Sequence, residues 1–393
     1  MDYNLRSLQM HEENRGKIEV VSKVPLQSRE DLSTAYTPGV AEPCRKIHEN
    51  EDEVYKYTSK GNMVAVVSDG SAVLGLGNIG PKAGIPVMEG KAILFKAFAN
   101  VDAFPICLDT QDTEEIIKAV KLIAPVFGGI NLEDISAPRC FEIEERLKKE
   151  LDIPVFHDDQ HGTAVTVLAG LINASKVVKK DLQESTVVIN GIGAAGSAIA
   201  KILLAYGCRK LYLVDRNGMI NKNKPETMLN WAHEELGELT NVDLREGSLE
   251  DALVGADVFI GVSKPGLVTK DMVTKMNKGA IIFAMANPTP EIFPEEAYAG
   301  GAIVVGTGRS DYPNQVNNVL VFPGIFRGAL DVRANEINEE MKLAAAIALA
   351  GFIPDTELNE TNILPNTLNR GVAQVVAEAT AKAARDAGVA KIY

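Results

Sequence analysis

Apolar and polar positions divide the chain into two series in which strand-like and helix-like segments alternate. In the first series, short apolar runs predict strands at 63–68, 103–108, 126–130 and 153–156, with helices over 91–99, 113–124 and 136–151. The second series predicts strands at 186–190, 210–215, 258–262, 280–284 and 302–305, with a helix over 194–206. Further helices are predicted over 162–178, 333–350 and 368–387. This alternation indicates an α/β fold with parallel strands.

Length and composition add a division into domains and exclude several kinds of partner. The 393 residues exceed the roughly 250–300 at which a single core stops growing, so we expect two domains. A net charge of −13 argues against nucleic acid and anionic membrane surfaces as partners. The four cysteines lack C-x-x-C spacing, and the polar first 20 residues lack the apolar stretch of a signal peptide. We therefore expect a cytoplasmic protein.

A glycine motif, G-x-G-x-x-G, occurs twice, and its second copy has the context that dinucleotide binding requires. This copy comprises Gly191, Ile192, Gly193, Ala194, Ala195 and Gly196. A predicted strand precedes it, a helix opens within it, and Asp215 ends the next strand about 20 residues later. The helix N-terminus would face the pyrophosphate, and Asp215 would accept hydrogen bonds from the adenosine ribose.

The first copy of the motif, at residues 75–80, lacks this context. Pro81 follows its last glycine, and Pro86 and Gly90 interrupt the segment where a helix should run. We interpret it as a glycine loop that could still approach a ligand closely.

The choice between NAD and NADP depends on charge near Asp215. Its carboxylate would repel the 2′-phosphate of NADP, which favours NAD. Arg216 follows directly, and Lys222 and Lys224 lie close in sequence and could bind that phosphate instead. We expect NAD to be preferred, with NADP as the alternative.

Two pairs of carboxylates, Glu133-Asp134 and Asp158-Asp159, follow predicted strands of the first series. The carboxyl ends of parallel strands meet at one edge of a sheet, so these pairs can converge there. Oxygen ligands suit a hard cation, Mg²⁺ or Mn²⁺. His157 and His161 flank the second pair, but without a third nitrogen or sulfur ligand nearby zinc is the weaker expectation.

Several segments together resemble the malic enzyme family, in its short bacterial form. They include Thr34-Ala-Tyr36-Thr-Pro-Gly39, Ser68-Asp-Gly-Ser-Ala-Val-Leu-Gly75, Ile85-Pro-Val-Met-Glu-Gly90-Lys91, Leu132-Glu133-Asp134, His157-Asp158-Asp159-Gln-His-Gly-Thr163, Ala286-Asn287-Pro288 and Val316-Asn317-Asn318. With the motifs, the resemblance implies an N-terminal α/β substrate domain of residues 1–157 and a Rossmann-type, doubly wound dinucleotide-binding domain of residues 158–365. A closing helical segment, 366–393, would pack back on the region between them.

The resemblance also implies an activity and a set of site residues. The activity is oxidative decarboxylation of malate to pyruvate and CO₂ with NAD(P)⁺ and Mg²⁺ or Mn²⁺. Lys91 would be the general base and Tyr36 the general acid, with Asp158 beside the lysine. Glu133, Asp134 and Asp159 would bind the metal, and Asn287 and Asn317 would lie near substrate and nicotinamide. As a base, Lys91 needs a lowered pKa, from burial or a nearby cation.

The sequence departs from the family pattern at one position, and two alternative functions stay open. Larger malic enzymes carry an arginine two residues after Asp-Gly, whereas Ser71 and Ala72 follow Asp69-Gly70 here. Arg309, Lys82 or main-chain N–H groups are candidates to hold the distal carboxylate of malate.

The same catalytic residues could serve a malolactic enzyme that releases lactate, and a non-catalytic NAD-binding regulatory protein is the other alternative. We expect a homodimer, with a site that two subunits could share.

Overall fold

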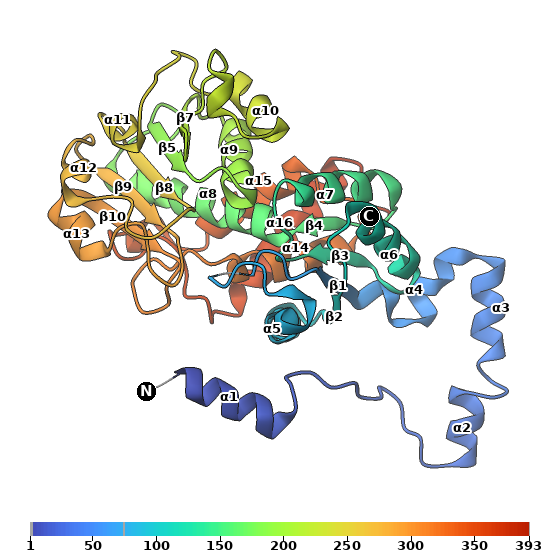
Figure 1. The fold of residues 1–393 in the computed structure, drawn as a ribbon. Helices are drawn as coiled ribbons and strands as arrows, with labels where there is room; N and C mark the ends of the chain where they lie inside the picture. Colours follow the sequence, from blue (N-terminus) through green and yellow to red (C-terminus); the bar gives the residue numbers. More distant parts are fainter. Residues whose placement is uncertain (1–2, 74, 393) are drawn as a thin grey trace.

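The computed structural model describes residues 3–73 and 75–392, and the fold is the expected α/β class (Figure 1). The first sheet has four parallel strands in the order β2-β1-β3-β4. Its strands are β1 (Met63–Ser68), β2 (Asp102–Cys107), β3 (Gly129–Leu132) and β4 (Val155–His157). In β1 every residue from Val64 to Ser68 is buried, as expected where helices cover both faces of a parallel sheet.

The second sheet has six strands in the order β10-β9-β8-β5-β6-β7, and only the short β7 runs antiparallel. Its strands are β5 (Thr186–Asn190), β6 (Lys210–Asp215), β7 (Gly218–Met219), β8 (Val258–Gly261), β9 (Ala280–Ala284) and β10 (Ala302–Thr307). In both sheets the strand order reverses beside the first strand, at β1/β3 and at β5/β8. A crevice at the carboxyl ends of the strands forms at such a switch point, and ligands bind there.

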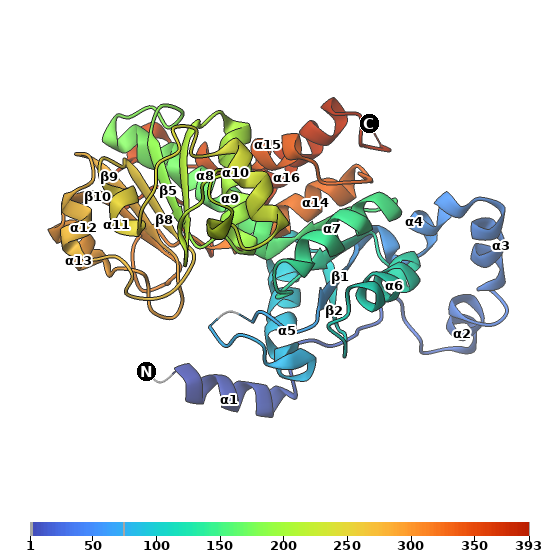
Figure 2. The same ribbon diagram turned by 45° about the horizontal axis from the view of Figure 1, so that its top comes forward.

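Each sheet has one face with its own helices, and a layer of long helices lies between the two sheets (Figures 1 and 2). The outer face of the first sheet packs on α6 (Thr113–Ile123) and α7 (Arg139–Glu150). The outer face of the second packs on α11 (Leu249–Leu253), α12 (Lys270–Thr274) and α13 (Pro294–Ala299), while α10 (Trp231–Leu239) contacts α9.

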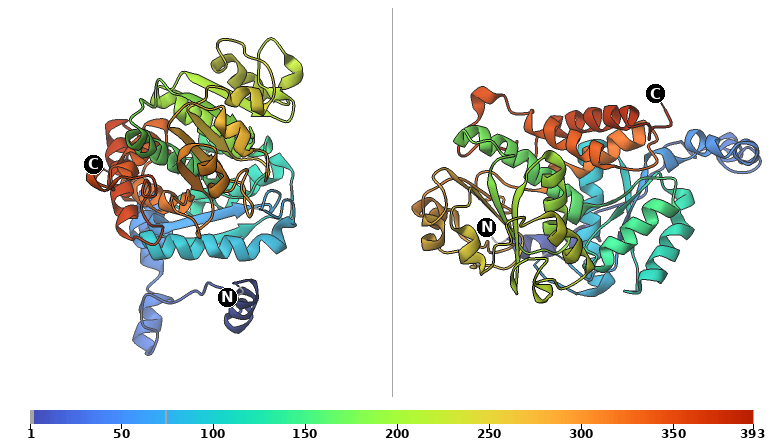
Figure 3. Two further views of the ribbon diagram at one scale, coloured as in Figure 1. Left: turned by 90° about the vertical axis from the view of Figure 1, so that its left-hand side faces the viewer. Right: turned by 90° about the horizontal axis from the view of Figure 1, so that it is seen from above.

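The helices between the sheets share one hydrophobic core, which runs from Val64 and Phe156 of the first sheet to Ile189 of the second. They are α5 (Gly80–Ala99), α8 (Asp158–Val178), α9 (Ala194–Tyr206), α14 (Phe322–Asp331), α15 (Glu339–Ala350) and α16 (Gly371–Asp386). The C-terminal helix α16 packs against α14 and α15 and touches α5, so it joins elements of both halves (Figure 3). None of the helices in the described residues is both long and apolar enough to cross a membrane.

The N-terminal segment, residues 3–50, forms an arm that stands away from this body (Figures 1 and 3). Its helices are α1 (Tyr3–Asn14), α2 (Arg29–Ala35) and α3 (Ala41–Glu49), and none of them has a buried residue. The short elements η1 (Glu51–Glu53), α4 (Val54–Tyr57) and η2 (Ser59–Asn62) connect the arm to β1. The remaining short 3-10 turns are η3 (Ala124–Val126), η4 (Pro225–Thr227), η5 (Asn318–Leu320) and η6 (Asp355–Glu357).

Most of the expected elements are confirmed, but the helix before Lys91 is longer than expected. The prediction that Pro86 and Gly90 interrupt a helix is wrong, because α5 begins at Gly80 and continues through both residues. Pro81 fits the first turn, where its missing N–H costs nothing. The buried residues Gly84, Met88, Lys91, Ala92 and Phe95 follow helical spacing, so packing of this face outweighs the one main-chain bond that Pro86 removes.

Other helix starts also differ from the prediction. α7 begins at Arg139, and the expected cap Ser136 lies outside it and accepts a hydrogen bond from Arg139 instead. α8 begins at Asp158 rather than 162, directly after β4. α15 begins at Glu339 rather than 333, where Asn338 caps it by accepting the Met341 N–H.

Candidate active site

A buried lysine lies at the carboxyl edge of the first sheet, between two carboxylates. Lys91 Nζ lies 2.6 Å from Asp158 Oδ2 and 2.9 Å from Glu133 Oε1, and all three side chains are buried. Glu133 follows β3 and Asp158 follows β4, so adjacent strand ends aim both groups at the lysine on α5. The ring of Phe322 covers the ammonium group at 4.2 Å. The structure thus brings together three of the residues expected in the site.

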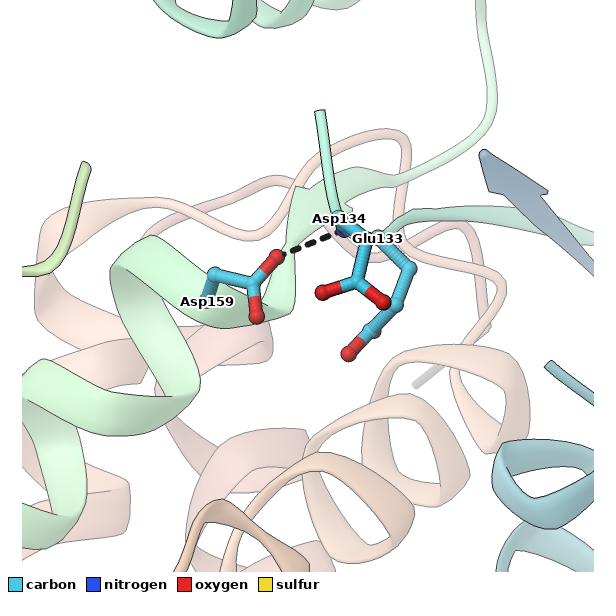
Figure 4. A group of neighbouring side chains, drawn as sticks. All are labelled: Glu133, Asp134 and Asp159. Atoms are coloured by element: carbon cyan, nitrogen blue, oxygen red, sulfur yellow. Dashed lines mark hydrogen bonds between the residues drawn. The ribbon is translucent and has the colours of Figure 1, made fainter. Parts of the chain in front are cut away.

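Glu133, Asp134 and Asp159 form a cluster in which one carboxylate oxygen of each lies within 4.8 Å of the others (Figure 4). The Asp134 N–H donates to Asp159 Oδ2 at 2.7 Å, which holds the two strand ends together. Asp134 has a left-handed backbone with φ of 54°, a conformation that aspartate tolerates better than most residues. The three expected metal ligands are therefore neighbours.

The cluster fits a hard divalent cation. Asp134 Oδ2 is buried without a hydrogen-bond partner among the described residues. Burial, followed by the charges of Asp159 and Glu133, raises the pKa of Asp134 to about 9. Burial likewise raises the pKa of Glu133 and of Asp159. Crowded carboxylates with an unused oxygen are the donor set that Mg²⁺ or Mn²⁺ prefers, and the nearest histidine nitrogen, His157 Nδ1, is 3.8 Å from Asp159.

In the chain by itself, burial is not enough to give Lys91 the lowered pKa that a base needs. Burial does oppose the ammonium form, but Asp158 and Glu133 outweigh it and raise the pKa of Lys91 above its ordinary value. Lys91 is consequently the cation of a buried ion pair, and it could act as a base only if another positive charge took over its carboxylates.

Glycine and asparagine neighbours shape the Asp158 pocket. A Cβ on Gly162 would lie 1.8 Å from Asp158 Oδ1, so the glycine of the His-Gly-Thr sequence leaves room for this carboxylate. Asn318 donates its amide N–H to Asp158 Oδ2. Sequence reasoning missed Asn318 and singled out its neighbour Asn317, whose side-chain oxygen accepts the Val319 N–H and caps η5.

The first glycine motif approaches a loop of the second half of the chain. Gly75 approaches Asn287 and Pro288, since a Cβ there would lie 3.5 Å from Asn287 O. Arg309 donates to Pro288 O at 2.8 Å and pairs with Asp311, so it lies beside the Asn287 loop. Lys82 is exposed on the first turn of α5. Of the two side chains considered for the distal carboxylate, Arg309 is therefore the one that adjoins a site residue.

The second glycine motif has the geometry of a phosphate-binding turn. Gly191 has a φ of +97°, and a Cβ on Gly196 would lie 1.9 Å from Gly191 O. Around Gly193 nothing lies within 4 Å of such a Cβ, which leaves open space at the N-terminus of α9. Ile192 is buried, while Ala194 and Ala195 form the first turn of α9. The first glycine closes the turn, the second is open to a ligand and the third permits close packing.

Asp215 ends β6 next to this turn, as expected. Its Oδ1 accepts the Arg216 N–H at 2.7 Å, and its Oδ2 lies 3.8 Å from His233 Nε2. The Arg216 side chain is exposed. Lys222 and Lys224 form ion pairs with Glu238 and Glu246, so neither is a free phosphate ligand in this arrangement.

Tyr36 is the one expected catalytic residue that the structure does not bring to the site. It directly follows α2, a helix of the arm that lies apart from α5 (Figures 1 and 2), and it is 67% exposed. Within the described residues, the hydrogen bonds of Tyr36 are main-chain bonds to Leu32 and Val40.

Sequence reasoning also missed Arg139, which braces the loop after β1. Its guanidinium donates to Asp69 Oδ2 at 2.9 Å and to Ser71 Oγ at 3.1 Å. Asp69 is fully buried, and its other oxygen accepts the Ser71 hydroxyl at 2.6 Å. Because four acceptors already surround Arg139, this arginine supports the loop rather than replacing the arginine of larger malic enzymes.

Comparison with protein families matches both halves of the chain. The malic enzyme N-terminal domain matches residues 15–148, and the malic enzyme NAD-binding domain matches residues 160–385. A "Bifunctional malic/malolactic enzyme" of Bacillus subtilis is 59% identical over 100% of this chain and 95% of its own length. An "NAD-dependent malic enzyme" of Geobacillus stearothermophilus is 63% identical over 96% and 78%. An "NADP-dependent malic enzyme" of Halomonas elongata is 46% identical over 96% and 92%.

Solved structures agree with this over nearly the whole chain. A malic enzyme from Pyrococcus horikoshii superposes with a TM-score of 0.95 at 52% identity, over 99% of this chain and 92% of that one. An NAD-dependent malic enzyme from Thermotoga maritima gives 0.93 at 52%, over 95% and 98%. Two matched domains, full-length relatives and a shared fold around the same carboxylate and glycine motifs lead to one conclusion: the chain belongs to the malic enzyme family.

Proposed function

We propose that this protein catalyses the oxidative decarboxylation of malate to pyruvate and CO₂ with NAD(P)⁺ as oxidant. The observation that carries the proposal is the position of Lys91, held by Asp158 and Glu133 beside the three-carboxylate cluster. Gly75, in the loop after β1, approaches Asn287 of the half that carries the dinucleotide motif. We infer that a hydride acceptor bound at the dinucleotide motif would face this proton acceptor and cation site.

Each residue has a defined task in this reaction. Lys91 takes the proton of the C2 hydroxyl while the C2 hydride passes to the nicotinamide. Loss of CO₂ from the resulting keto acid leaves an electron pair on C3, and Tyr36 supplies the proton there. Asp158 keeps Lys91 in place and Asn287 and Asn317 contact substrate and nicotinamide. A divalent cation held by Glu133, Asp134 and Asp159 would neutralise their charge, lower the pKa of Lys91 and polarise the C2 oxygen.

Steady-state kinetics with malate test this proposal directly. We expect NADH and pyruvate in equal amounts, loss of turnover on chelation with EDTA, and recovery with Mn²⁺ or Mg²⁺. Asp159→Asn should raise the Mn²⁺ concentration needed for half-maximal rate, while Glu145→Gln on the exposed face of α7 should not. Malate turnover that persists without any divalent cation would contradict the metal assignment.

We propose NAD as the preferred cofactor. Asp215 ends β6 beside the glycine turn, and the nearby Lys222 and Lys224 are engaged by glutamates. Replacement of Asp215 by serine should lower kcat/KM for NAD⁺ and raise it for NADP⁺, because the carboxylate no longer repels a 2′-phosphate. A wild-type protein that uses NADP⁺ better than NAD⁺ would contradict this preference.

A malolactic activity is the second candidate, since one full-length relative is named for both activities. In that reaction the NADH would stay bound and reduce the keto acid product to lactate. Product analysis separates the two: lactate without net NADH formation indicates the malolactic reaction. Both products together would indicate that this chain, like that relative, carries both activities.

We propose a homodimer in which the arm of each subunit places Tyr36 in the site of its partner. The arm exposes Val20, Val21, Leu32 and Tyr36, apolar surface that a second copy would cover. A mixture of Tyr36→Phe and Lys91→Ala proteins tests this arrangement. With exchanged arms, a mixed dimer has one site with both native residues, so random mixing restores about a quarter of wild-type activity. With sites inside one subunit, mixing restores none.

We also propose a domain boundary between residues 157 and 158 and a cytoplasmic location. The boundary coincides with the junction of β4 and α8, and the two family matches leave this junction between them. The four cysteines are unpaired, as is usual in a reducing compartment. Limited proteolysis and fractionation of the native host test the two statements.

A further inference from the structure

Behind the site, a buried glutamate of α7 binds the end of strand β4. Glu144 Oε1 accepts the main-chain N–H of His157 at 3.1 Å. Its Oε2 accepts the His161 Nε2–H at 2.8 Å, with Gln160 Nε2 at 3.4 Å. Lys148 Nζ lies 2.8 Å from Oε1. Four groups from three elements, β4, α8 and α7, therefore converge on one carboxylate that is only 5% exposed.

The charge of this carboxylate is maintained by its surroundings. Burial opposes ionisation, but His161, by its hydrogen bond, and Lys148, by its charge, hold the pKa of Glu144 well below its usual range. Burial lowers the pKa of His161 itself to about 4, so its ring is neutral at neutral pH. Lys342 Nζ on α15 donates to His161 Nδ1 at 3.2 Å, which leaves Nε2–H to donate to Glu144. The hydrogen bonds run in one direction from α15 to Glu144.

The position of β4 explains why a side chain is needed at its end. β4 is an edge strand, paired with β3 on one side only. The outward N–H groups of an edge strand have no strand partner, and burying one without an acceptor is costly. Glu144 satisfies the N–H of His157, which is the last residue of β4 and directly precedes Asp158 and Asp159. A displacement of this peptide would move both aspartates.

We propose that Glu144 is a positioning residue that sets the β4–α8 junction, so that Asp158 meets Lys91 and Asp159 joins Glu133 and Asp134 as a cation ligand. The inference rests on the proposed function, because it assumes that the carboxylate cluster binds a divalent cation. The essential contact is the bond to the His157 N–H, and the branch through His161 and Lys342 is dispensable for the cation.

The alternative is a merely structural role, in which Glu144 only stabilises the buried charges of α7, α8 and α15. The two roles differ in what the folded variants do. A structural role lowers the melting temperature but leaves Mn²⁺ affinity unchanged in protein that is folded. A positioning role changes Mn²⁺ affinity according to which bond is lost, because groups that orient metal ligands typically contribute 10–100-fold to affinity.

Three substitutions of Glu144 separate the contribution of its side-chain length from that of its charge. Glu144→Asp keeps the charge but is one methylene too short for the His157 N–H. Glu144→Gln loses the charge but keeps an oxygen at that position. Glu144→Ala loses both. Glu145→Gln is the matched control, since Glu145 is the exposed neighbour and pairs with Lys149.

The experiment measures Mn²⁺ binding to the full chain without substrate, from the electron paramagnetic resonance signal of free Mn²⁺. Folding of each variant is checked by circular dichroism. We expect Kd for Mn²⁺ to rise about 10–100-fold in Glu144→Asp and Glu144→Ala and less than threefold in Glu144→Gln and Glu145→Gln. Equal Kd values in all folded variants, or a Gln variant as weak as the Ala variant, would overturn the proposal.

Two further variants keep the proposal testable if Glu144→Asp and Glu144→Ala do not fold. Lys342→Met and Lys148→Met each remove a cation that faces the Glu144 network but leave the His157 bond intact. Both should bind Mn²⁺ within twofold of wild type, and a tenfold loss in either would overturn the proposal. A wild-type chain that binds no Mn²⁺ contradicts the proposed function instead, so the two failures are distinguishable.

Discussion

The two residues proposed for proton transfer lie in regions of opposite character. Lys91 is on α5, a helix with six buried residues, and two carboxylates and a phenylalanine ring surround its ammonium group. Tyr36 is in the arm, whose helices α1 to α3 have no buried residue. One proton carrier therefore has a position determined by contacts within its own chain, whereas the other is exposed in the arm.

Local interactions shape the arm, but they are weak. Ser28 and Asp31 form a capping box that starts α2, and α2 has only seven residues. Helices shorter than about 12–15 residues are marginal in water unless they pack on something. The arm is tied to its own body near residue 17, where Lys17 Nζ donates to Pro86 O at 2.6 Å and the Lys17 N–H donates to Glu89. Lys23 also pairs with Asp102 of β2 at 3.5 Å, and after it α2 and α3 stand away from the body (Figure 1).

We expect the largest effect on turnover from replacing Lys91, the proposed proton carrier in the body. Replacement of Lys91 by methionine removes the proton acceptor and leaves Asp158 and Glu133 without their counter-ion. We expect kcat for malate oxidation to fall by about 10²–10⁴-fold. Turnover is measured by NADH formation, and NAD⁺ binding by fluorescence titration is the control that should stay unchanged. Turnover within tenfold of wild type would contradict the role of Lys91.

Deletion of the arm tests the proposed roles of Tyr36 and of the dimer contact. A chain that starts at residue 51 loses Tyr36 and the proposed dimer contact but no buried side chain of the arm helices. We expect malate turnover to fall by about 10²–10⁴-fold while circular dichroism of the body is retained. The melting temperature of the full chain should rise with protein concentration, and that of the deleted chain should not. Equal concentration dependence in both would show that the arm does not hold the dimer.

Truncation of a side chain should lower the free energy of unfolding much more in the body than in the arm. Phe326 on α14 is fully buried and packs on Phe95 and Phe156, with ring centroids 5.3 and 5.8 Å apart. Phe326→Ala should lower the free energy of unfolding by about 3–5 kcal/mol. Leu32→Ala in the arm, where Leu32 is 49% exposed, should change it by at most about 0.5 kcal/mol at concentrations where the chain is monomeric. Urea unfolding checks both values, and a large effect at Leu32 in the monomer would mean that the arm packs on its own body.

The same contrast explains which parts of the molecule could be predicted. Strands such as 63–68, 186–190 and 210–215 were predicted to the residue, because a strand buried on both faces is a continuous apolar run. The carboxylates converge as expected because strand ends meet at one edge of a sheet. The start of α5 was missed because packing of its buried face overrides the breaking tendency of Pro86.

Other features could not be read from the chain because they depend on distant contacts. Glu144 lies in a charged helical stretch with no motif, and only the fold shows that its neighbour in space is the end of β4. Asn318, which donates to Asp158, follows Asn317 in the sequence, and the family resemblance implied a role for Asn317 only. Tyr36 was placed in the site by resemblance alone, and the single chain leaves it exposed in the arm.

Thiol labelling gives the smallest effect and compares the regions within one sample. Cys44 is exposed on α3, whereas burial raises the pKa of Cys208 to about 11 and also raises the pKa of Cys140 and Cys107. Because the thiolate is the reactive form, about one Cys208 in a thousand is reactive at pH 8, and its rate should rise about tenfold per pH unit up to pH 11. We expect one fast thiol per chain with a disulfide reagent, absent in Cys44→Ser.

The same reaction can report on the proposed dimer. If a partner covers the arm, the labelling rate of Cys44 should fall as the protein concentration rises, while the labelling rates of Cys107, Cys140 and Cys208 should stay unchanged. A Cys44 rate that is independent of concentration across the monomer–dimer range would mean that α3 stays uncovered in the dimer.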